Sequence, residues 1–335
     1  MKTETLRAFE KATQSRPVQT WIHPYGPPDD PAEHQFVLFL KPEATAVHDG
    51  VDLEAVLDLV FEHLEDFGVT VHAARALPAA YLDHHAILDQ HYGVINRISK
   101  LGVEALTDDA LNKLNEVFAE EISAGALIMG GHQFLKAQPE ISPLALTTMN
   151  DNIGTTKLAG GSYAMRLKVL GQTYILLNPF HAYQLVPFTM PGRAILVFEC
   201  RSTRDWSDLR VNLTGATNPA KAEAGSIRAD LRAQKEALGM KEVNQGANGV
   251  HLSAGPLEGM VELQRFFTDH DTNKALDWDE TAFGARLLRK LSHDDVTRLA
   301  GNPNLEVDGK MVSAFDLTEE INADRALDCL SERLA

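Results

Sequence analysis

Near the start of the chain, two short apolar runs flank one stretch in which hydrophobic and polar residues recur at helical spacing. Residues 36–40, Phe-Val-Leu-Phe-Leu, are an unbroken apolar run typical of a buried strand. Residues 52–66 place apolar side chains at helical spacing along one face, which predicts a helix closed by Gly68. A second strand is predicted at 69–74 and a further helix over 79–92. The chain therefore begins with a β-α-β unit.

A similar pattern returns in the second half of the chain. Residues 194–198, Ala-Ile-Leu-Val-Phe, predict another buried strand, and residues 203–211 predict a short helix. A loop rich in Gly, Pro and Asn follows at 215–225. Residues 256–267 predict a helix with Pro256 in its first turn and apolar side chains along one side. The two halves together indicate an α+β core.

The segment between these halves, 93–178, has a different pattern. It begins with helical spacing, becomes glycine-rich, and ends in two β-rich runs joined at Gly171-Gln172, which is typical of a hairpin. We interpret it as an α/β insertion into the core. The predicted organisation is an N-terminal tail at 1–34, a core at 35–92 and 179–270, the insertion at 93–178, and an acidic, mostly helical C-terminal extension at 271–335.

Composition limits the class of protein. The 335 residues are 44% hydrophobic and 23% charged, which is ordinary for a chain with a substantial core. The net charge of −16 argues against general nucleic-acid binding, because an acidic chain gains nothing from releasing phosphate counterions. A few local cations still suffice to bind one small anion.

The cysteine content and the lack of long apolar runs indicate the cellular compartment. Its two cysteines, Cys200 and Cys329, exclude a disulfide scaffold and favour a reducing compartment. The polar N-terminal stretch does not resemble a signal peptide, and no apolar run has the length of a membrane helix. We therefore expect a cytoplasmic protein with neither a membrane nor a nucleic acid as its partner.

A histidine near the last predicted helix is a candidate nucleophile. A histidine attacks phosphorus only when one ring nitrogen is unprotonated, and a carboxylate on the other nitrogen fixes that tautomer. His251 has Asn248 and Ser253 close in sequence, and Glu262 lies off the apolar stripe of the helix that follows. Taken alone, such a histidine is more often structural than catalytic.

Groups suited to phosphate occur upstream of this histidine. Thr217 lies in a Gly-Ala-Thr-Asn-Pro loop, and Arg228 and Arg210 flank that loop. Lys41 directly follows a core strand and would project from its end. Each of these side chains alone is as easily a solvated surface residue. Walker A and GxGxxG patterns are not found, so neither a P-loop nor a dinucleotide-binding turn is supported.

The order of these pieces resembles the nucleoside diphosphate kinases. The shared pieces are Lys41-Pro42-Glu43, His91-Tyr92, Pro179-Phe180, an arginine after an apolar strand, Gly215–Pro219, Gly225–Asp230, Asn248 three residues before His251, Ser253 and Glu262. The resemblance covers roughly 35–92 and 179–267, about half of the chain. It implies a ferredoxin-like antiparallel sheet with helices on it.

The resemblance also implies an activity, in which the terminal phosphoryl of ATP or another nucleoside triphosphate passes through phosphohistidine at His251 to a nucleoside diphosphate. Glu262 would orient the histidine, with Ser253 as a hydrogen-bonding neighbour. The residues implied to hold phosphates are Lys41, Arg210, Thr217 and Arg228. Mg²⁺ would bridge the nucleotide phosphates, with no metal ligand supplied by the protein.

Three further roles complete the implied site. Tyr92 would contact the phosphate or His251, Asn248 would bind a sugar hydroxyl, and Phe180 would stack on the base. The family's assembly would make the chain a homo-oligomer, but the insertion leaves that assembly open.

The chain departs from the family pattern at several positions. Leu252 and Ala254 stand where the family has glycine and aspartate, and one extra residue separates Arg210 from the following loop, so Arg204 is an alternative phosphate ligand. The insertion falls where the family has its nucleotide lid. Two alternatives therefore remain: the same phosphohistidine chemistry with a nucleoside, a nucleoside monophosphate or a small metabolite as acceptor, or an inactive nucleotide-binding module.

Overall fold

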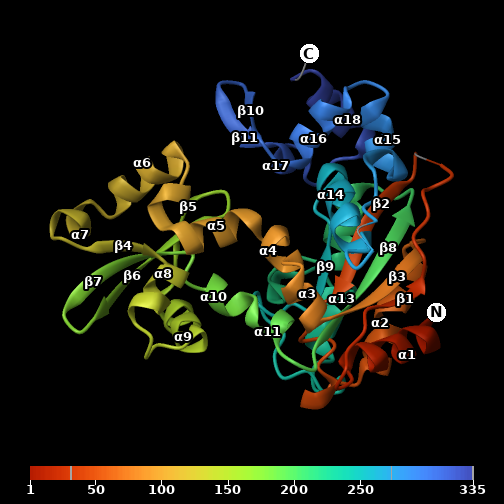
Figure 1. Cartoon of the computed structure of the whole chain (residues 1–335), viewed down its shortest axis with the longest axis horizontal. Coiled ribbons are helices and arrows are strands. Elements are labelled where there is room, and N and C mark those ends of the chain that lie inside the picture. Colours follow the sequence, from red (N-terminus) through yellow and green to blue (C-terminus); the bar gives the residue numbers. More distant parts are fainter. Residues whose placement is uncertain (31, 273, 334–335) are drawn as a thin grey trace. The chain divides into compact units, whose positions relative to one another are not determined.

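The computed structural model describes residues 1–30, 32–272 and 274–333, which form two compact units (Figure 1). The core unit comprises residues 1–85 and 190–335, and the inserted unit comprises residues 86–189. The predicted insertion, 93–178, lies within the inserted unit. Among the described residues, no helix has the length and apolar character needed to cross a bilayer.

The core unit is built on a five-stranded sheet in the order β1-β3-β8-β2-β9. The strands are β1 (Thr20–His23), β2 (His34–Leu40), β3 (Thr70–Pro78), β8 (Ala194–Ser202) and β9 (Val250–Leu252). Every neighbouring pair is antiparallel. Apart from β1, the chain runs β-α-β-β-α-β with strand order 2-3-1-4, which is the ferredoxin-like arrangement. The predicted α+β class with an antiparallel sheet is confirmed.

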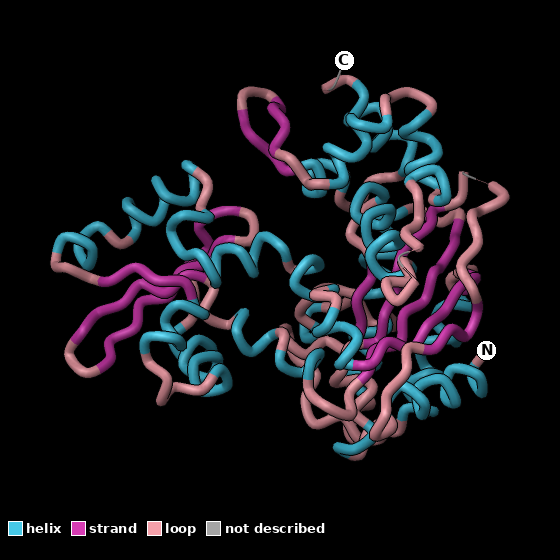
Figure 2. Tube along the Cα trace, in the orientation of Figure 1, coloured by secondary structure: helices cyan, strands magenta, loops and turns pink. Residues whose placement is uncertain are grey.

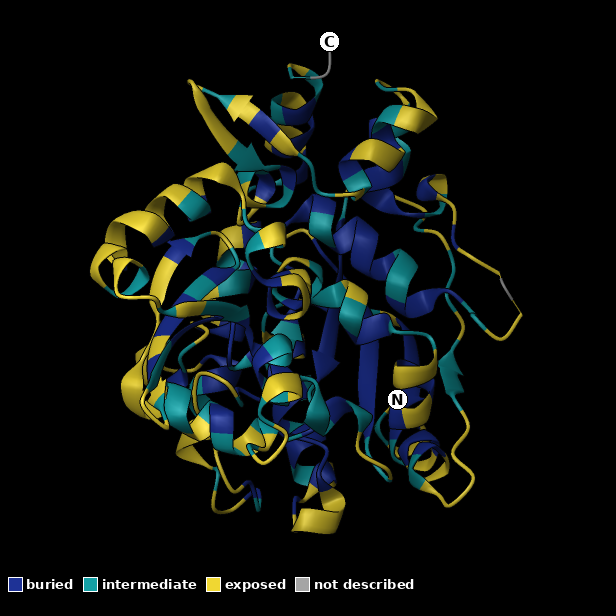
Figure 3. Ribbon diagram, turned by 60° about the vertical axis from the view of Figure 1, so that its left-hand side comes forward, coloured by how far each residue is buried: buried dark blue, intermediate teal, exposed yellow. Residues whose placement is uncertain are grey.

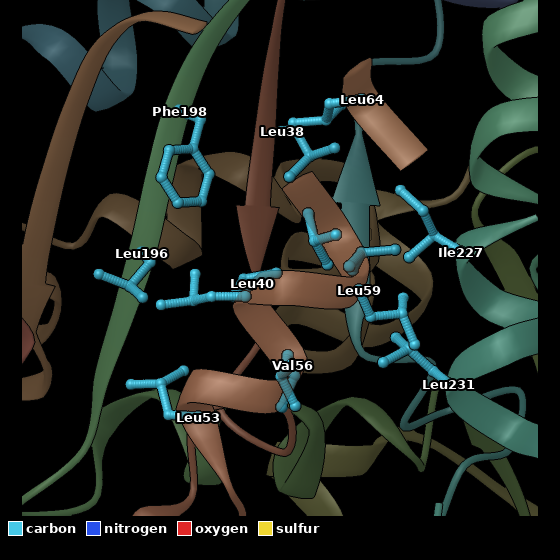
Figure 4. Packing of buried hydrophobic residues seen from close by; sticks show 14 of the residues in the cluster. Leu38, Leu40, Leu53, Val56, Leu59, Leu64, Leu196, Phe198, Ile227 and Leu231 are labelled. Carbon is cyan, nitrogen blue, oxygen red and sulfur yellow. The ribbon is translucent and has the colours of Figure 1, made fainter. Parts of the chain in front are cut away.

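Alternation along the strands separates the two faces of this sheet. In β2, Phe36, Leu38 and Leu40 pack into the main hydrophobic cluster, so Val37 and Phe39 point to the opposite face. The main cluster also takes side chains from β8 and from helices α2 (Leu53–Asp66) and α13 (Ile227–Ala233) (Figure 4). β2 and β8 are buried along their whole length (Figure 3). Both faces are therefore covered.

Helix α2 forms for reasons visible in its sequence. The Asp52 side chain accepts a hydrogen bond from the Ala55 amide at 3.0 Å, which caps the first turn. Its buried side chains recur at helical spacing and include Val56, Leu57 and Leu64. Gly68 then adopts φ 63°, a conformation that suits glycine and ends the helix.

The N-terminal residues, predicted to be a peripheral tail, contribute to the packing of the core unit. Helix α1 (Lys2–Thr13) buries Ala8, Phe9 and Ala12 in the main hydrophobic cluster. Strand β1 pairs antiparallel with β3 at the sheet edge. The predicted helix over 79–92 is two shorter helices, α3 (Ala79–His84) and α4 (Ile87–His91), because Ala86 between them is left-handed at φ 50°.

The opposite face of the sheet carries helix α14 (Pro256–Phe267), and the C-terminal extension packs on that helix in turn. Leu257, Met260 and Val261 of α14 belong to a hydrophobic cluster otherwise made by residues of the extension. The extension contains α15 (Ala282–Leu288), α16 (His293–Ala300), β10 (Asn304–Val307), β11 (Lys310–Ser313), α17 (Ala314–Thr318) and α18 (Ala323–Ser331). The hairpin β10–β11 is an addition to the helical pattern that the sequence predicts. Helix α14 thus lies between the sheet and the extension.

The inserted unit has its own four-stranded sheet in the order β4-β7-β6-β5 (Figure 2). Its strands are β4 (Leu127–Gly130), β5 (Thr156–Ala159), β6 (Ser162–Val169) and β7 (Gln172–Leu177). The other helices of this unit are α5 (Gly93–Leu101), α6 (Asp108–Val117), α7 (Ala119–Ser123), α8 (Gly131–Ala137), α9 (Pro143–Ile153), α10 (His181–Gln184) and α11 (Val186–Thr189). Two separate hydrophobic clusters form, one around Ile98 and Leu114 and the other around Phe134 and Leu146.

The hairpin of the inserted unit turns one residue earlier than the sequence predicts. Val169 pairs with Gln172, so the two turn residues are Leu170 and Gly171. Both have positive φ, at 48° and 86°, which matches the twist of the flanking strands. Leucine is unfavourable in this conformation, which is why the sequence did not identify it as a turn residue.

We expect Leu57→Ala to destabilise the core unit by about 2–5 kcal/mol, because it leaves a cavity beneath the sheet at a fully buried position. Urea unfolding followed by tryptophan fluorescence measures this, since Trp21, Trp206 and Trp278 all lie in the core unit. The matched control is Glu62→Ala, an exposed position of the same helix, which should change stability by less than about 0.5 kcal/mol. Equal effects of the two substitutions would contradict the assigned packing.

Candidate functional site

His251 occupies the middle of β9, the strand at one end of the sheet order. It pairs with Phe39 of β2, and the two rings stack with centroids 4.6 Å apart and planes 20° from parallel. Because Phe39 points to the α14 face, the imidazole lies on that face as well. The His251 side chain is 17% exposed, so it is held by packing while still reachable from solvent.

A buried carboxylate binds one nitrogen of this ring. His251 Nε2 lies 2.8 Å from Glu262 Oε1 and 3.0 Å from Oε2. Ser253 Oγ donates to Oε2 at 2.5 Å and itself accepts from the Val37 amide at 3.0 Å. Both Glu262 and Ser253 are fully buried. With Nε2–H donating to the carboxylate, the lone pair of the imidazole lies on Nδ1.

Glu258, one turn before Glu262 on α14, is a second acidic group that the sequence patterns did not single out. Its Oε2 accepts from the Ala254 amide at 2.8 Å. The pKa of Glu258 is raised to about 8, mainly by burial and in addition by the negative charge of the neighbouring Glu262. The only available sequence signal was its i, i+4 spacing from Glu262, which is common on solvated helix faces.

Arg228 connects the loop before α13 to β9. Its Nη1 donates to the Gly215 carbonyl at 2.7 Å and its Nη2 to the Val250 carbonyl at 3.0 Å. The residue is 5% exposed. The guanidinium predicted to hold phosphate is therefore also a structural tie between the loop and the strand that carries His251.

Asn248 and Thr217 meet at the same loop. Asn248 Nδ2 donates to the Thr217 carbonyl at 3.1 Å, while the Thr217 side chain is exposed. Asn248 is 2% exposed, and within the described part of the chain its Oδ1 has no hydrogen-bond partner. A buried amide oxygen without a donor is unusual and suits a ligand hydroxyl.

Lys41 directly follows β2, next to the residue that precedes β9. Its backbone amide donates to the Gly249 carbonyl at 2.9 Å, and Glu43 Oε1 accepts from the Gly249 amide at 2.9 Å. Burial lowers the pKa of Lys41, an effect that Arg228 strengthens and Glu43 opposes. The structure thus brings Lys41 and Arg228 close enough to interact electrostatically.

Arg210 lies in a π-helix, Leu209–Thr214, that follows the short helix α12 (Trp206–Asp208). The Gly215 amide bonds to the Arg210 carbonyl at 3.1 Å, five residues back, and a turn of this kind contains one extra residue. The extra residue that the sequence shows between Arg210 and the loop at Gly215 therefore lies within this π-helix. Arg210 Nη1 donates to the Leu252 carbonyl at 2.9 Å, directly beside His251.

Arg204, the alternative to Arg210, has a different setting. Its side chain is 55% exposed, pairs with Asp208 at 3.8 Å, and lies 6.0 Å from the centre of the Phe67 ring. Arg210, by contrast, donates directly to the Leu252 carbonyl of β9.

Tyr92 and Phe180, the two remaining predicted site residues, belong to the inserted unit. Tyr92 lies between α4 and α5, with its ring 6.0 Å from that of His181 and 6.4 Å from that of Phe188. Phe180 precedes α10, and its ring meets that of Tyr163 edge-on at 5.8 Å. Their predicted roles toward phosphate and base remain predictions.

The chain matches no protein-family model and no curated protein. Among solved structures it is similar to an NDP kinase from Pyrobaculum aerophilum, with 19% sequence identity and a TM-score of 0.33 over 72% of this chain and 98% of that chain. A similarity at this level identifies neither a family nor an activity.

The raised pKa of Glu258 predicts a pH dependence of stability. The pKa of this carboxyl rises from 4.5 to about 8 on folding, so the folded chain binds the proton more tightly than the unfolded chain does. Its contribution to the free energy of unfolding is therefore present at low pH and is lost as the pH increases toward 8. Between about pH 5 and pH 8, the free energy of unfolding should therefore fall more steeply for the unmodified chain than for Glu258→Gln. Urea titrations across this range measure the two slopes.

The control is Glu62→Gln, which changes an exposed glutamate and should leave the slope of the unmodified chain intact. Parallel slopes for the unmodified chain and Glu258→Gln would show that Glu258 titrates normally.

Proposed function

We propose that this protein is a phosphotransferase that moves the terminal phosphoryl of a nucleoside triphosphate through phosphohistidine at His251 to a nucleoside diphosphate. The observation that carries the proposal is the hydrogen-bonded series Ser253–Glu262–His251. It directs Nε2–H to a buried carboxylate and leaves the lone pair on Nδ1, which is the state a histidine nucleophile requires. The ordered motifs that resemble the nucleoside diphosphate kinases add support.

The transfer proceeds in two balanced steps. His251 Nδ1 forms a bond to the terminal phosphorus, the bond from that phosphorus to the bridging oxygen breaks, and the diphosphate leaves with the electron pair. The imidazole gains positive charge, which the Glu262 carboxylate stabilises through Nε2–H. A terminal oxygen of the acceptor diphosphate then attacks the phosphorus, and Nδ1 leaves with its lone pair restored.

Phosphate binding would use the cations around β9. Lys41, Arg210 and Arg228 come from three different segments, and the exposed Thr217 side chain adds a hydroxyl. This set of donors fits phosphate oxygens rather than a bare metal ion. Mg²⁺ would therefore be held through the nucleotide phosphates, where it supplies neutralisation of the charge that develops during transfer.

The sugar and base contacts are also part of the proposal. The buried Oδ1 of Asn248 would accept a hydrogen bond from a ribose hydroxyl, which would give that oxygen its missing donor. Tyr92 and Phe180 keep the phosphate and base roles that the family resemblance implies.

One observation favours a second acceptor class. The segment that the family uses as a lid is here an independently packed unit with its own sheet and two hydrophobic clusters. Such a unit offers enough surface to select a nucleoside, a nucleoside monophosphate or a small metabolite as acceptor. If labelled phospho-protein forms and nucleoside diphosphates fail to discharge it, this second acceptor class replaces the first.

Incubation with γ-labelled ATP and magnesium should give an acid-labile, alkali-stable label on the protein, and His251→Ala should abolish it. The matched control is His293→Ala, because His293 is exposed on α16, away from β9 in sequence and fold. The control should label as the unmodified chain does. ATP binding by calorimetry without any label would indicate a binding module and contradict the proposal.

Glu262→Gln should slow label formation by roughly a hundredfold, because an amide cannot stabilise the charge that develops on the imidazole. Glu258→Gln is the comparison within the same helix, since its carboxyl contacts the Ala254 amide rather than His251. Single-turnover labelling measures both rates. Equal rates for the two variants would mean that Glu262 serves only the packing of α14.

A further inference from the structure

The C-terminal extension contacts the short segment between β9 and α14 through its backbone. The Glu320 amide donates to the Ala254 carbonyl at 2.9 Å, one residue after Ser253. Gly255 makes room for this approach, because a Cβ at that position would collide with the carbonyl oxygen of Thr318. Glu320 itself has φ 58°, a left-handed conformation that a residue with a side chain adopts only when its surroundings impose it.

A second attachment follows immediately along the chain. The Asn322 side chain accepts from the Trp206 amide at 2.8 Å and donates to Asp205 at 2.6 Å. The stretch from Thr318 to Asn322 is therefore held at both ends, at α14 on one side and at α12 on the other.

This attached stretch places two carboxylates on Arg210. Glu319 Oε1 lies 3.5 Å from Arg210 Nη2, and Glu320 Oε1 lies 3.8 Å from its Nε. The remaining nitrogen, Nη1, donates to the Leu252 carbonyl. Arg210 is 16% exposed, whereas Glu319 and Glu320 are 43% and 46% exposed. The two nitrogens that a phosphate would take in bidentate fashion thus lie within ion-pair distance of acidic side chains of the same chain, and among the described residues Nε has no hydrogen-bond partner.

We propose that Glu319 and Glu320 act as a built-in competitor for the phosphate groups of the substrate at Arg210, an inference that rests on the proposed phosphotransferase function. Half-exposed pairs at these distances are weak, so a multiply charged phosphate displaces them. The backbone attachments keep the carboxylates nearby, so they return when the phosphate leaves. The contact therefore lowers the affinity for phosphate without closing the site.

The test compares two double variants of the full chain. Glu319→Gln with Glu320→Gln removes the competing charges and keeps the side-chain size. Glu306→Gln with Asp308→Asn is the matched control, because it removes two exposed carboxylates from the β10–β11 hairpin and changes the net charge equally. Titration calorimetry with tripolyphosphate measures the dissociation constant of the anion without relying on any reaction.

We expect tripolyphosphate to bind the Glu319/Glu320 variant about two- to tenfold more tightly than either the unmodified chain or the control. The difference should shrink at high ionic strength, because salt screens half-exposed charges. Unchanged or weaker binding by this variant, or no binding by any of the three proteins, would overturn the proposal.

A measurement on the unmodified chain covers the case in which the variant does not fold. The side-chain carboxylate resonances of Glu319 and Glu320 in nuclear magnetic resonance spectra should shift when tripolyphosphate is added, because these carboxylates lose their contact with Arg210. Unchanged carboxylate resonances would contradict displacement. Labelling with γ-labelled ATP separates the two proposals. If the Glu319/Glu320 variant binds the anion more tightly but no protein is labelled, the competition is supported and the phosphotransferase activity is contradicted. If the protein is labelled but the anion affinity is unchanged, the phosphotransferase activity is supported and the competition is contradicted.

Discussion

A carboxylate inside a protein costs free energy unless hydrogen bonds satisfy it, and Glu262 imposes this requirement on the core unit. Its partners are Ser253 and His251, which come from β9 and the residue that follows it. Ser253 in turn accepts from the Val37 amide of β2. One carboxyl group therefore ties helix α14, the end strand and a central strand together. The same contacts that satisfy the buried charge also set the tautomer of the imidazole.

This arrangement needs α14 to be held accurately against the sheet. Arg75 of β3 is fully buried and donates to the carbonyls of Phe266 and Thr268, both at 2.8 Å, at the C-terminal end of the helix. The C-terminal extension covers the outer side of α14 and contacts its N-terminal end at Gly255. The C-terminal extension, which the sequence suggests is peripheral, thus helps to position Glu262. It also places two carboxylates, those of Glu319 and Glu320, beside Arg210.

Periodicity in the sequence predicts β2 and α14, but not the three-residue strand β9 that carries His251 or helix α13 that carries Arg228. The apolar run of β2 and the helical spacing of α14 are strong local signals, and the pairing of His251 with Glu262 follows from motifs close together in the chain. The environment of Arg210 depends on Glu319 and Glu320, which lie far away in sequence, so no local pattern indicates it. Helix α1 was missed as core because its buried residues are few and include only one large apolar side chain, Phe9.

The most direct test of the central claim is to determine which ring nitrogen of His251 carries the phosphoryl group after reaction with a nucleoside triphosphate. Because Glu262 accepts the hydrogen bond from Nε2, the nitrogen available for attack is Nδ1. Phosphorus–nitrogen correlation by nuclear magnetic resonance on the phospho-protein distinguishes the two isomers. The account predicts phosphorylation at Nδ1. Phosphorylation at Nε2, or no phosphohistidine at His251, would contradict it.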